Sequence, residues 1–486
     1  MVAKSRNMAR KMMSELPKCP SGIQGLDEVT FGGLPKGRPT LVCGSAGCGK
    51  TLLAMEFLCR GAVKYHEPGV FMAFEEREED LRENFASLGF DLASLVKHKK
   101  LVIDYVYIER SEIEETGEYN LEGLFVRLAS AIDSIGAKRV VLDTIEALFS
   151  GFSNETILRA ELRRLFRWLK DRGVTAVVTG EKGHTLLTKH GLEEYVADCV
   201  IFLDHRVTAQ IATRRLKIVK YRGSKHGTNE FPFLIDTNGI SVFPTTSLLL
   251  SRNVSSERIS SGIKSLDEMF GDKGYYRGST ILVSGSAGSG KTSFGAQFVD
   301  SVCRNGQRAL YFAFEESEGQ LSRNMKSISI NLKHWIDKGR LKIVANRATL
   351  CGLEMHLVMA HNAVREFKPA IVIIDPITTL TGAGIEDEAK LMIARLLDFL
   401  KNNDITVLAT DLTIVGENGE ATEIGISSLC DTWIKLSMET QGHGRMRRIT
   451  IIKSRGMEHG LETKDLLITD NGLEIKDIPG SRENCT

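Results

Sequence analysis

Short apolar runs rich in β-branched residues alternate along this chain with longer amphipathic segments. In the first half, runs of this kind predict buried strands at 40–44, 70–74, 101–105, 139–143, 175–180, 199–203 and 216–221. Residues 52–63 and 155–171 have the periodicity of amphipathic helices. Nearly continuous apolar strands separated by helices are typical of a mostly parallel sheet covered by helices on both faces. The predicted fold class is therefore α/β.

The second half of the chain repeats the first. Four segments recur in the same order: SGIQGLDEV (21–29) as SGIKSLDEM (261–269), VFMAFEE (70–76) as LYFAFEE (310–316), RVVLDT (139–144) as IVIIDP (371–376), and KYRGSKHG (220–227) as KSRGMEHG (453–460). Four collinear matches predict two homologous domains. We expect a tail at 1–15, a first domain at 16–246, a linker at 247–253, a second domain at 254–475 and a short tail at 476–486.

Each half contains a phosphate-binding loop between a predicted strand and a predicted helix. The motif G-x-x-x-x-G-K-[ST] occurs as GSAGCGKT and as GSAGSGKT. Its glycines let backbone N–H groups face phosphates, and the helix N-terminus adds a positive end. The predicted ATP-binding residues are Gly44, Ser45, Ala46, Gly47, Cys48, Gly49, Lys50, Thr51, Gly285, Ser286, Ala287, Gly288, Ser289, Gly290, Lys291 and Thr292. Lys50 and Lys291 would reach the β- and γ-phosphates, and Thr51 and Thr292 would ligate Mg²⁺.

Two further acidic positions recur at the ends of strands. Asp143 and Asp375 each end an apolar strand, where a phosphate-loop protein orients its Mg²⁺; the alternative is a helix cap. The pairs Glu75–Glu76 and Glu315–Glu316 close the strand that follows the phosphate-loop helix. Ligands bind at the carboxyl ends of parallel strands, so these acids are candidate catalytic bases. The alternative is that they only begin the next helix, where acids suit its dipole.

One pair of cations lies near the end of each domain. Lys220 and Arg222 belong to KYRG, and Lys453 and Arg455 belong to KSRG. They are either solvated strand charges or fingers that reach the γ-phosphate held by a neighbouring subunit. The finger interpretation requires a ring of subunits with ATP at the interfaces.

Composition limits the partners that can be expected. The chain has 63 basic and 62 acidic residues, a net charge of +1, which disfavours a protein that coats nucleic acid. The nine cysteines include no C-x-x-C pair, so neither a zinc site nor a disulfide scaffold is indicated. No run approaches the roughly 18 apolar residues of a membrane span, and the N-terminus lacks the apolar centre of a signal peptide. We expect a cytoplasmic protein.

Taken together, these motifs resemble the KaiC family of circadian-clock ATPases and kinases. The resemblance rests on two domains, each with GSAGxGKT, a strand ending in FEE and a KxRG element, and it extends from SGIQGLDEV to about LEIKDI. It implies two tandem RecA-like domains, a homohexamer with two tiers, and ATP and Mg²⁺ as cofactors. It also implies slow ATP hydrolysis in the first domain and autophosphorylation in the second.

The resemblance places the phosphorylation sites at Ser427 and Ser428, in EIGISSLCDTWIKL, with Thr422 as a third hydroxyl. The matching first-domain segment carries Glu193 and Glu194 instead of a hydroxyl pair. This asymmetry favours water as the acceptor in the first domain and serine in the second. Glu315 would take the serine proton, with Glu316 supporting it, while Glu75 and Glu76 would activate water.

The resemblance also bears on partners. A KaiB-like protein could bind the first domain, whereas the tail PGSRENCT is unlike the extended segment that recruits KaiA, which disfavours regulation by KaiA. Two other functions fit the same fold: a DNA-dependent ATPase of the recombinase or helicase type, and a signalling scaffold that binds ATP without phosphoryl transfer. DNA-stimulated hydrolysis would favour the first, and an unmodified protein after incubation with Mg²⁺-ATP would favour the second.

Overall fold

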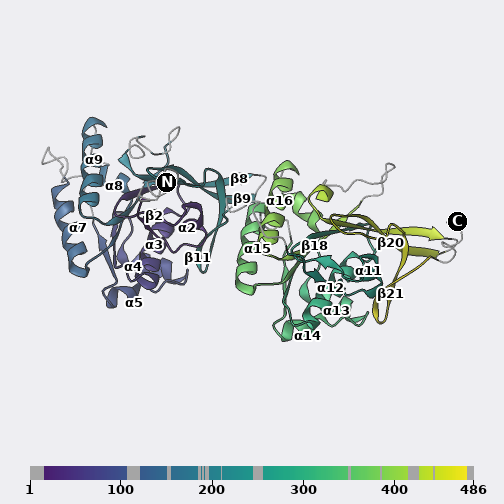
Figure 1. Ribbon diagram of the computed structural model, residues 1–486. Coiled ribbons are helices and arrows are strands. Elements are labelled where there is room, and N and C mark those ends of the chain that lie inside the picture. Colours follow the sequence, from purple (N-terminus) through teal and green to yellow (C-terminus); the bar gives the residue numbers. More distant parts are fainter. Residues whose placement is uncertain are drawn as a thin grey trace, which may run out of the picture. The chain divides into compact units, whose positions relative to one another are not determined.

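The computed structural model describes residues 16–106, 121–149, 155–183, 188, 191, 196–208, 211–244, 255–347, 352–383, 386–413, 426–441 and 444–478. The chain divides into two compact units, Met1–Ser247 and Leu248–Thr486, each a sheet with helices packed on it (Figure 1).

The first unit alternates strands and helices as the sequence predicts. Its strands are β1 (Lys18–Cys19), β2 (Leu34–Pro35), β3 (Pro39–Gly44), β4 (Gly69–Ala73), β5 (Leu101–Tyr105), β6 (Arg139–Asp143), β7 (Thr175–Glu181), β8 (Cys199–Thr208), β9 (Ile211–Tyr221), β10 (Glu230–Asp236) and β11 (Gly239–Val242). Its helices are α2 (Leu26–Val29), α3 (Lys50–Lys64), α4 (Glu78–Ala86), α5 (Leu92–Lys97), α7 (Glu122–Ile135), α8 (Ile145–Phe149) and α9 (Glu155–Asp171).

The second unit repeats this order. Its strands are β12 (Arg258–Ile259), β13 (Tyr275–Tyr276), β14 (Thr280–Gly285), β15 (Ala309–Ala313), β16 (Leu341–Ala345), β17 (Ile371–Asp375), β18 (Thr406–Leu412), β19 (Thr432–Gln441), β20 (Gly444–Ser454), β21 (Lys464–Thr469) and β22 (Gly472–Lys476). Its helices are α11 (Lys264–Met269), α12 (Lys291–Arg304), α13 (Glu318–Lys326), α14 (Leu332–Asp337), α15 (Leu353–Phe367) and α16 (Glu386–Asn402), with 3₁₀ turns η2 (Ile377–Ala383) and η3 (Ile426–Ser428).

Each main sheet has a parallel centre and an antiparallel extension. The strand order is β11-β10-β9-β8-β3-β7-β6-β4-β5 in the first unit and β16-β15-β17-β18-β14-β19-β20-β21-β22 in the second. The phosphate-loop strands β3 and β14 pair in parallel with both neighbours. This arrangement confirms the predicted α/β fold of two tandem RecA-like domains, each a mostly parallel sheet flanked by helices.

The core of the first unit lies on both faces of its sheet. One cluster joins α3 to Phe71 and Val141, and the other joins α7 and α9 to Met72 and Leu142. Neighbouring strand residues point to opposite faces, so each strand supplies both clusters. The prediction that α3 is amphipathic needs correction, because even Lys50 and Glu56 on this helix are buried. Since α3 is enclosed between the sheet and the antiparallel extension, both sides of it are covered.

The antiparallel hairpin β10–β11 was not predicted from the sequence. Its turn contains Asn238–Gly239, and Gly239 has φ of 96°. A Cβ at Gly239 would lie 2.4 Å from a carboxylate oxygen of Glu56, which accepts a hydrogen bond from the Ile240 N–H at 2.7 Å. Glycine is therefore required there by both conformation and space. The hairpin is thus pinned to the phosphate-loop helix.

Within the part of the chain that the structure describes, no helix has both the length and the apolar character needed to cross a bilayer.

Candidate functional sites

The first phosphate loop connects β3 to α3. Gly47 and Gly49 have φ of 70° and 102°, a region that favours glycine. Lys50 is 8% exposed, and its Nζ donates to the carbonyl oxygens of Gly44 and Ser45, both at 3.0 Å. A Cβ added at Gly47 would meet no atom within 4 Å, so the crest of the loop is open. An anion can therefore approach the backbone at the N-terminus of α3.

The second phosphate loop reproduces this geometry between β14 and α12. Lys291 donates to the carbonyl oxygens of Gly285 and Ser286, both at 2.8 Å, and the crest at Gly288 is equally open. Burial lowers the pKa of Lys291, an effect that the carboxylates of Asp375, Glu315 and Asp411 oppose. The structure thus brings the predicted lysine, strand-terminal aspartate and first glutamate of this domain together.

The strand-terminal aspartates are held by hydroxyl groups from neighbouring strands. Asp143 accepts a hydrogen bond from Thr179 on β7. Burial raises the pKa of Asp143, and hydrogen bonds from the Thr179 and Thr51 hydroxyls act against this rise. Thr51 and Asp143, both predicted to orient Mg²⁺, therefore lie together.

In the second unit, Asp375 accepts hydrogen bonds from Thr410 on β18 and from the Tyr311 hydroxyl, the latter at 2.6 Å. Thr292 follows Lys291 in the first turn of α12. Mg²⁺ typically uses one or two protein ligands plus substrate phosphates. In the described residues no group of three or more His, Cys, Asp or Glu side chains is arranged to hold a metal alone.

The two glutamates of each pair have different partners. Glu75 accepts a hydrogen bond from the Thr144 hydroxyl at 2.9 Å, next to Asp143. Burial, together with the charge of Asp143, raises the pKa of Glu76, and a hydrogen bond from Asn84 opposes that rise. Both glutamates thus lie near the strand-terminal aspartate, and they differ in their hydrogen-bond partners: Glu75 accepts from Thr144, whereas Glu76 bonds back to α4.

The second unit divides its pair in the same way. Glu315 lies close enough to Lys291 to oppose the fall in its pKa, and Glu316 accepts from Asn324 on α13 at 3.4 Å. Helix α13 begins only at Glu318 and is capped by Ser317 through a capping box with Gln320. The glutamate pairs therefore precede the helices, which disfavours the alternative that they serve only as acidic first turns.

The KxRG cations lie near the amino ends of the parallel strands. The phosphate loop of the same domain follows the carboxyl end of its strand. Thr432 pairs with Ile281 at the start of β14, and Lys453 pairs with Trp433. Trp433 in turn pairs with Leu282, so the loop begins three strand positions beyond Lys453, at Gly285. At roughly 3.3 Å per residue that is about 10 Å along the sheet. In the first unit Lys220 pairs with Val200, next to the start of β3, and Arg222 follows β9.

Ser427 and Ser428 also lie near the amino ends of the parallel strands, in turn η3. Lys453 Nζ donates to the carbonyl oxygen of Ser427 at 2.6 Å, and an Nη atom of Arg455 donates to that of Ser428 at 2.8 Å. Ser427 is half-buried and Ser428 is exposed. The structure therefore brings the predicted phosphosites together with the predicted cations. Thr422, Glu193 and Glu194 lie outside the described residues.

Some polar residues near the sites were missed by the sequence reasoning. They are Thr179 and Thr410, Thr144, Tyr311, and the buried acids Glu146 and Asp411. A comparison of TAVVTG with TVLATD would have shown that both repeats place threonine at the same strand position. No motif marks the others, because their roles depend on which strands are neighbours.

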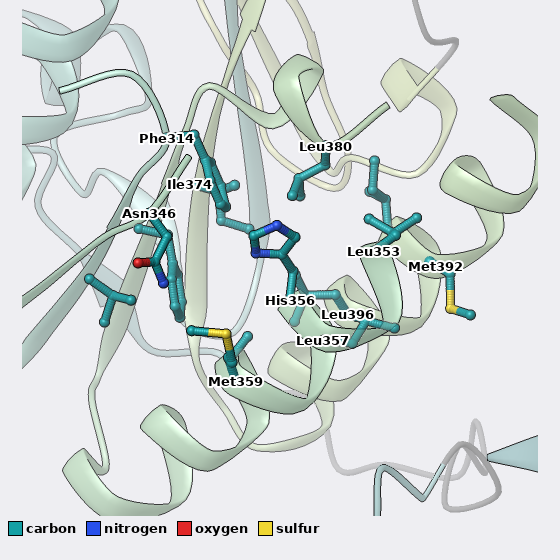
Figure 2. A pocket seen from close by; sticks show the side chains of 14 residues that line it. Phe314, Asn346, Leu353, His356, Leu357, Met359, Ile374, Leu380, Met392 and Leu396 are labelled. Carbon is teal, nitrogen blue, oxygen red and sulfur yellow. The ribbon is translucent and has the colours of Figure 1, made fainter. Parts of the chain in front are cut away.

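A small apolar cavity lies under Phe314, between β15, β17 and helices α15 and α16 (Figure 2). His356 meets Phe314 edge to face, with ring centroids 5.6 Å apart. The cavity has a volume of about 20 Å³. That is room for about one water molecule, and an apolar lining of this kind stays dry. We therefore assign the cavity no ligand.

Two phosphate loops, each next to a strand-terminal aspartate and a carboxylate pair, define a tandem P-loop nucleotide triphosphatase. The chain belongs to the KaiC family of ATPases: the family described as "ATPase: KaiC" matches residues 19–247 and again residues 259–480. Membership of this family implies ATP binding.

Curated relatives align with nearly the whole chain. "Circadian clock protein KaiC2" of Synechocystis sp. is 54% identical over 462 residues, which are 95% of this chain and 81% of the relative. "Circadian clock oscillator protein KaiC" of Parathermosynechococcus lividus is 37% identical over 476 residues, covering 96% and 87%. The protein of the same name from Acaryochloris marina is 36% identical over 467 residues, covering 95% and 89%.

Proposed function

We propose that this protein is an ATP-dependent serine autokinase and slow ATPase that works as a homohexameric ring, with ATP bound between subunits. The first domain hydrolyses ATP, and the second phosphorylates and dephosphorylates Ser427 and Ser428. We further propose a role in timing or stress signalling, in line with the clock names of the relatives. Membership of an ATPase family supports the hydrolytic part.

The observation that carries the kinase proposal is the position of the acceptor turn. Ser427 and Ser428 lie beside Lys453 and Arg455, near the amino ends of the parallel strands. The phosphate loop of the same domain follows the carboxyl end of β14. A serine at the amino ends of the strands cannot receive a phosphoryl group that is held at their carboxyl ends. Transfer therefore has to occur between copies, with acceptor and cations from one subunit meeting the loop of its neighbour.

The chemistry of the second domain follows from these residues. The Ser427 or Ser428 hydroxyl attacks the γ-phosphorus of ATP, the bond to the β,γ-bridging oxygen breaks, and ADP leaves. Glu315 of the neighbouring subunit accepts the hydroxyl proton, because it is the glutamate of the pair that lies near Lys291. Lys453 and Arg455 stabilise charge on the transferred group in trans. The proposed dephosphorylation takes place at the same interface.

In the first domain water takes the place of the serine. Glu75 accepts its proton, Glu76 supports the site from α4, and Lys220 and Arg222 act from the neighbouring subunit. Thr51 with Asp143, and Thr292 with Asp375, would hold Mg²⁺ at the two sites. When bound, Mg²⁺ neutralises charge that develops on the β- and γ-phosphate oxygens.

Mass spectrometry of the purified protein after incubation with Mg²⁺-ATP tests the proposal. We expect phosphate on Ser427 and Ser428, and loss of one site in each of the variants Ser427→Ala and Ser428→Ala. A protein that stays unmodified while it binds ATP would instead be a signalling scaffold. Hydrolysis that DNA strongly stimulates would favour a DNA-dependent ATPase. The proposed partners are further copies of this chain in the ring and a KaiB-like protein that binds the first domain.

A further inference from the structure

The side chains of Lys453 and Arg455 hold two consecutive residues of the acceptor turn. Lys453 donates to the Ser427 carbonyl oxygen at 2.6 Å, and Arg455 donates to that of Ser428 at 2.8 Å. Hydrogen bonds from charged donors are stronger than those between neutral groups. The main chain of each serine is therefore fixed by its own cation.

A β-bulge aims Lys453 at the turn. Ile451 pairs with Ile434, but Lys453 pairs with Trp433, so Ile452 is an extra residue in β20. Ile451 and Ile434 belong to the buried core. In a regular strand Lys453 would share the face of Ile451 and enter that core, and the bulge moves it to the face of Trp433 instead. The geometry of the cation is thus built into the strand.

The far end of the turn is anchored independently. Asp431 accepts the Thr280 N–H at 2.9 Å and pairs with Lys401 at 2.8 Å, and its carbonyl oxygen accepts the Arg455 N–H at 2.8 Å. This end of the turn is therefore fixed to β14 and α16, and Lys453 and Arg455 hold the main chain at the two serines.

We propose that Lys453 and Arg455 are positioning residues that decide which serine receives the phosphoryl group, Lys453 by presenting Ser427 and Arg455 by presenting Ser428. The proposal rests on the autokinase function above. It goes further than a role in charge stabilisation, because a cation that only stabilised the γ-phosphate would affect both serines alike. Misplacing a reacting group by about 1 Å can cost a hundredfold in rate, so release of one carbonyl is sufficient to change the preference.

The test is a time course of site-resolved phosphopeptide mass spectrometry on the full-length protein with Mg²⁺-ATP. We expect Lys453→Met to lower the initial Ser427:Ser428 ratio by about tenfold, and Arg455→Met to raise it by about tenfold. Lys453→Arg, which keeps a charged donor, restores the ratio. Arg445→Met, which removes an exposed cation at the other end of β20, is the matched control and leaves the ratio unchanged.

Equal loss at both serines, with the ratio unchanged, would overturn the inference and leave the autokinase function standing. If the unaltered protein carries no phosphate at either serine, the proposed function fails and the inference fails with it. Where a variant loses phosphorylation altogether, hydrogen exchange of residues 426–430 decides. Faster exchange than in the unaltered protein supports the positioning role, and unchanged exchange overturns it.

Discussion

In the second unit the hydroxyl of Thr410 donates a hydrogen bond to the carboxylate of Asp375 from the neighbouring strand. The first unit repeats the relationship with Thr179 and Asp143. In both repeats the aspartate at the end of one strand is thus held by the strand that separates it from the phosphate-loop strand. A hydrogen bond to the charged form of a carboxyl group favours that form.

This relationship predicts a pH dependence. Burial raises the pKa of Asp143 and the Thr179 hydrogen bond opposes the rise, so Thr179→Val moves the pKa higher. If the carboxylate form of Asp143 serves the Mg²⁺ site, hydrolysis is present above this pKa and is lost as the pH falls through it. The pH–rate profile of ATP hydrolysis should therefore show its acid limb at higher pH in Thr179→Val. Thr179→Ser keeps the hydroxyl and should keep the profile; identical profiles for Val and Ser would contradict the assignment.

The glutamate pairs predict unequal effects of substitution. Glu75 accepts a hydrogen bond from the Thr144 hydroxyl, next to Asp143, whereas Glu76 bonds back to α4. Glu75→Gln should lower ATP hydrolysis by about a hundredfold or more, since a positioned base contributes about that much. Glu76→Gln should lower the rate of ATP hydrolysis much less. Glu315→Gln and Glu316→Gln should show the same order for serine phosphorylation. An equal loss in both members of a pair, measured by initial rates, would contradict the division.

Removal of Mg²⁺ should stop the reactions of both domains. Substitution of Thr51 or Thr292 should affect the reaction of one domain only. Chelation with EDTA is expected to stop hydrolysis and phosphorylation together. Thr51→Val should raise the Mg²⁺ concentration needed for hydrolysis, and Thr292→Val should do so for phosphorylation, because each removes one hydroxyl ligand. Titration of Mg²⁺ with both readouts checks this. The serine variants keep the hydroxyl and are the matched controls. Unchanged Mg²⁺ dependence in both valine variants would rule out these ligands.

Arg139 predicts a difference in stability between the two domains. Its side chain is fully buried, donates to Glu67 and to the carbonyl oxygens of Phe57 and Pro20, and lies over the Phe57 ring. Arg139→Ala removes these hydrogen bonds and leaves the partly exposed Glu67 without its ion-pair partner, at a cost of about 1–3 kcal/mol.

Thermal unfolding should show this loss in the first domain alone. The second domain carries Ile371 at the matching position, and Ile371→Val, at about 0.5–1.5 kcal/mol, is the control. A shift of the second domain's transition in Arg139→Ala would contradict the prediction.

Much of the fold follows from local patterns in the sequence. The phosphate loops and the strands that precede Glu75 and end in Asp143 are short-range signals, and the structure has strands at the predicted places, although β4 ends at Ala73, before the glutamate pair. The hairpin around Gly239 was missed although Asn238–Gly239 is a strong turn signal. The sequence could not predict that Ser427 lies near the amino ends of the strands, because this position depends on the parallel pairing of Thr432 with Ile281. For the same reason the partners of Asp143 and Asp375 could be seen only in the fold.

In the proposed mechanism the second domain phosphorylates the serines of its neighbour, and a mixed ring distinguishes this from transfer within one copy. Two differently tagged copies are co-expressed, one with Ser427→Ala and Ser428→Ala, the other with Glu315→Gln and intact serines. Assemblies that contain both tags are purified and given Mg²⁺-ATP. Mass spectrometry should find phosphate on the serines of the Glu315→Gln copy, delivered by the intact site of its neighbour. Absence of phosphate from the mixed ring, when the unaltered protein phosphorylates itself, would contradict the claim.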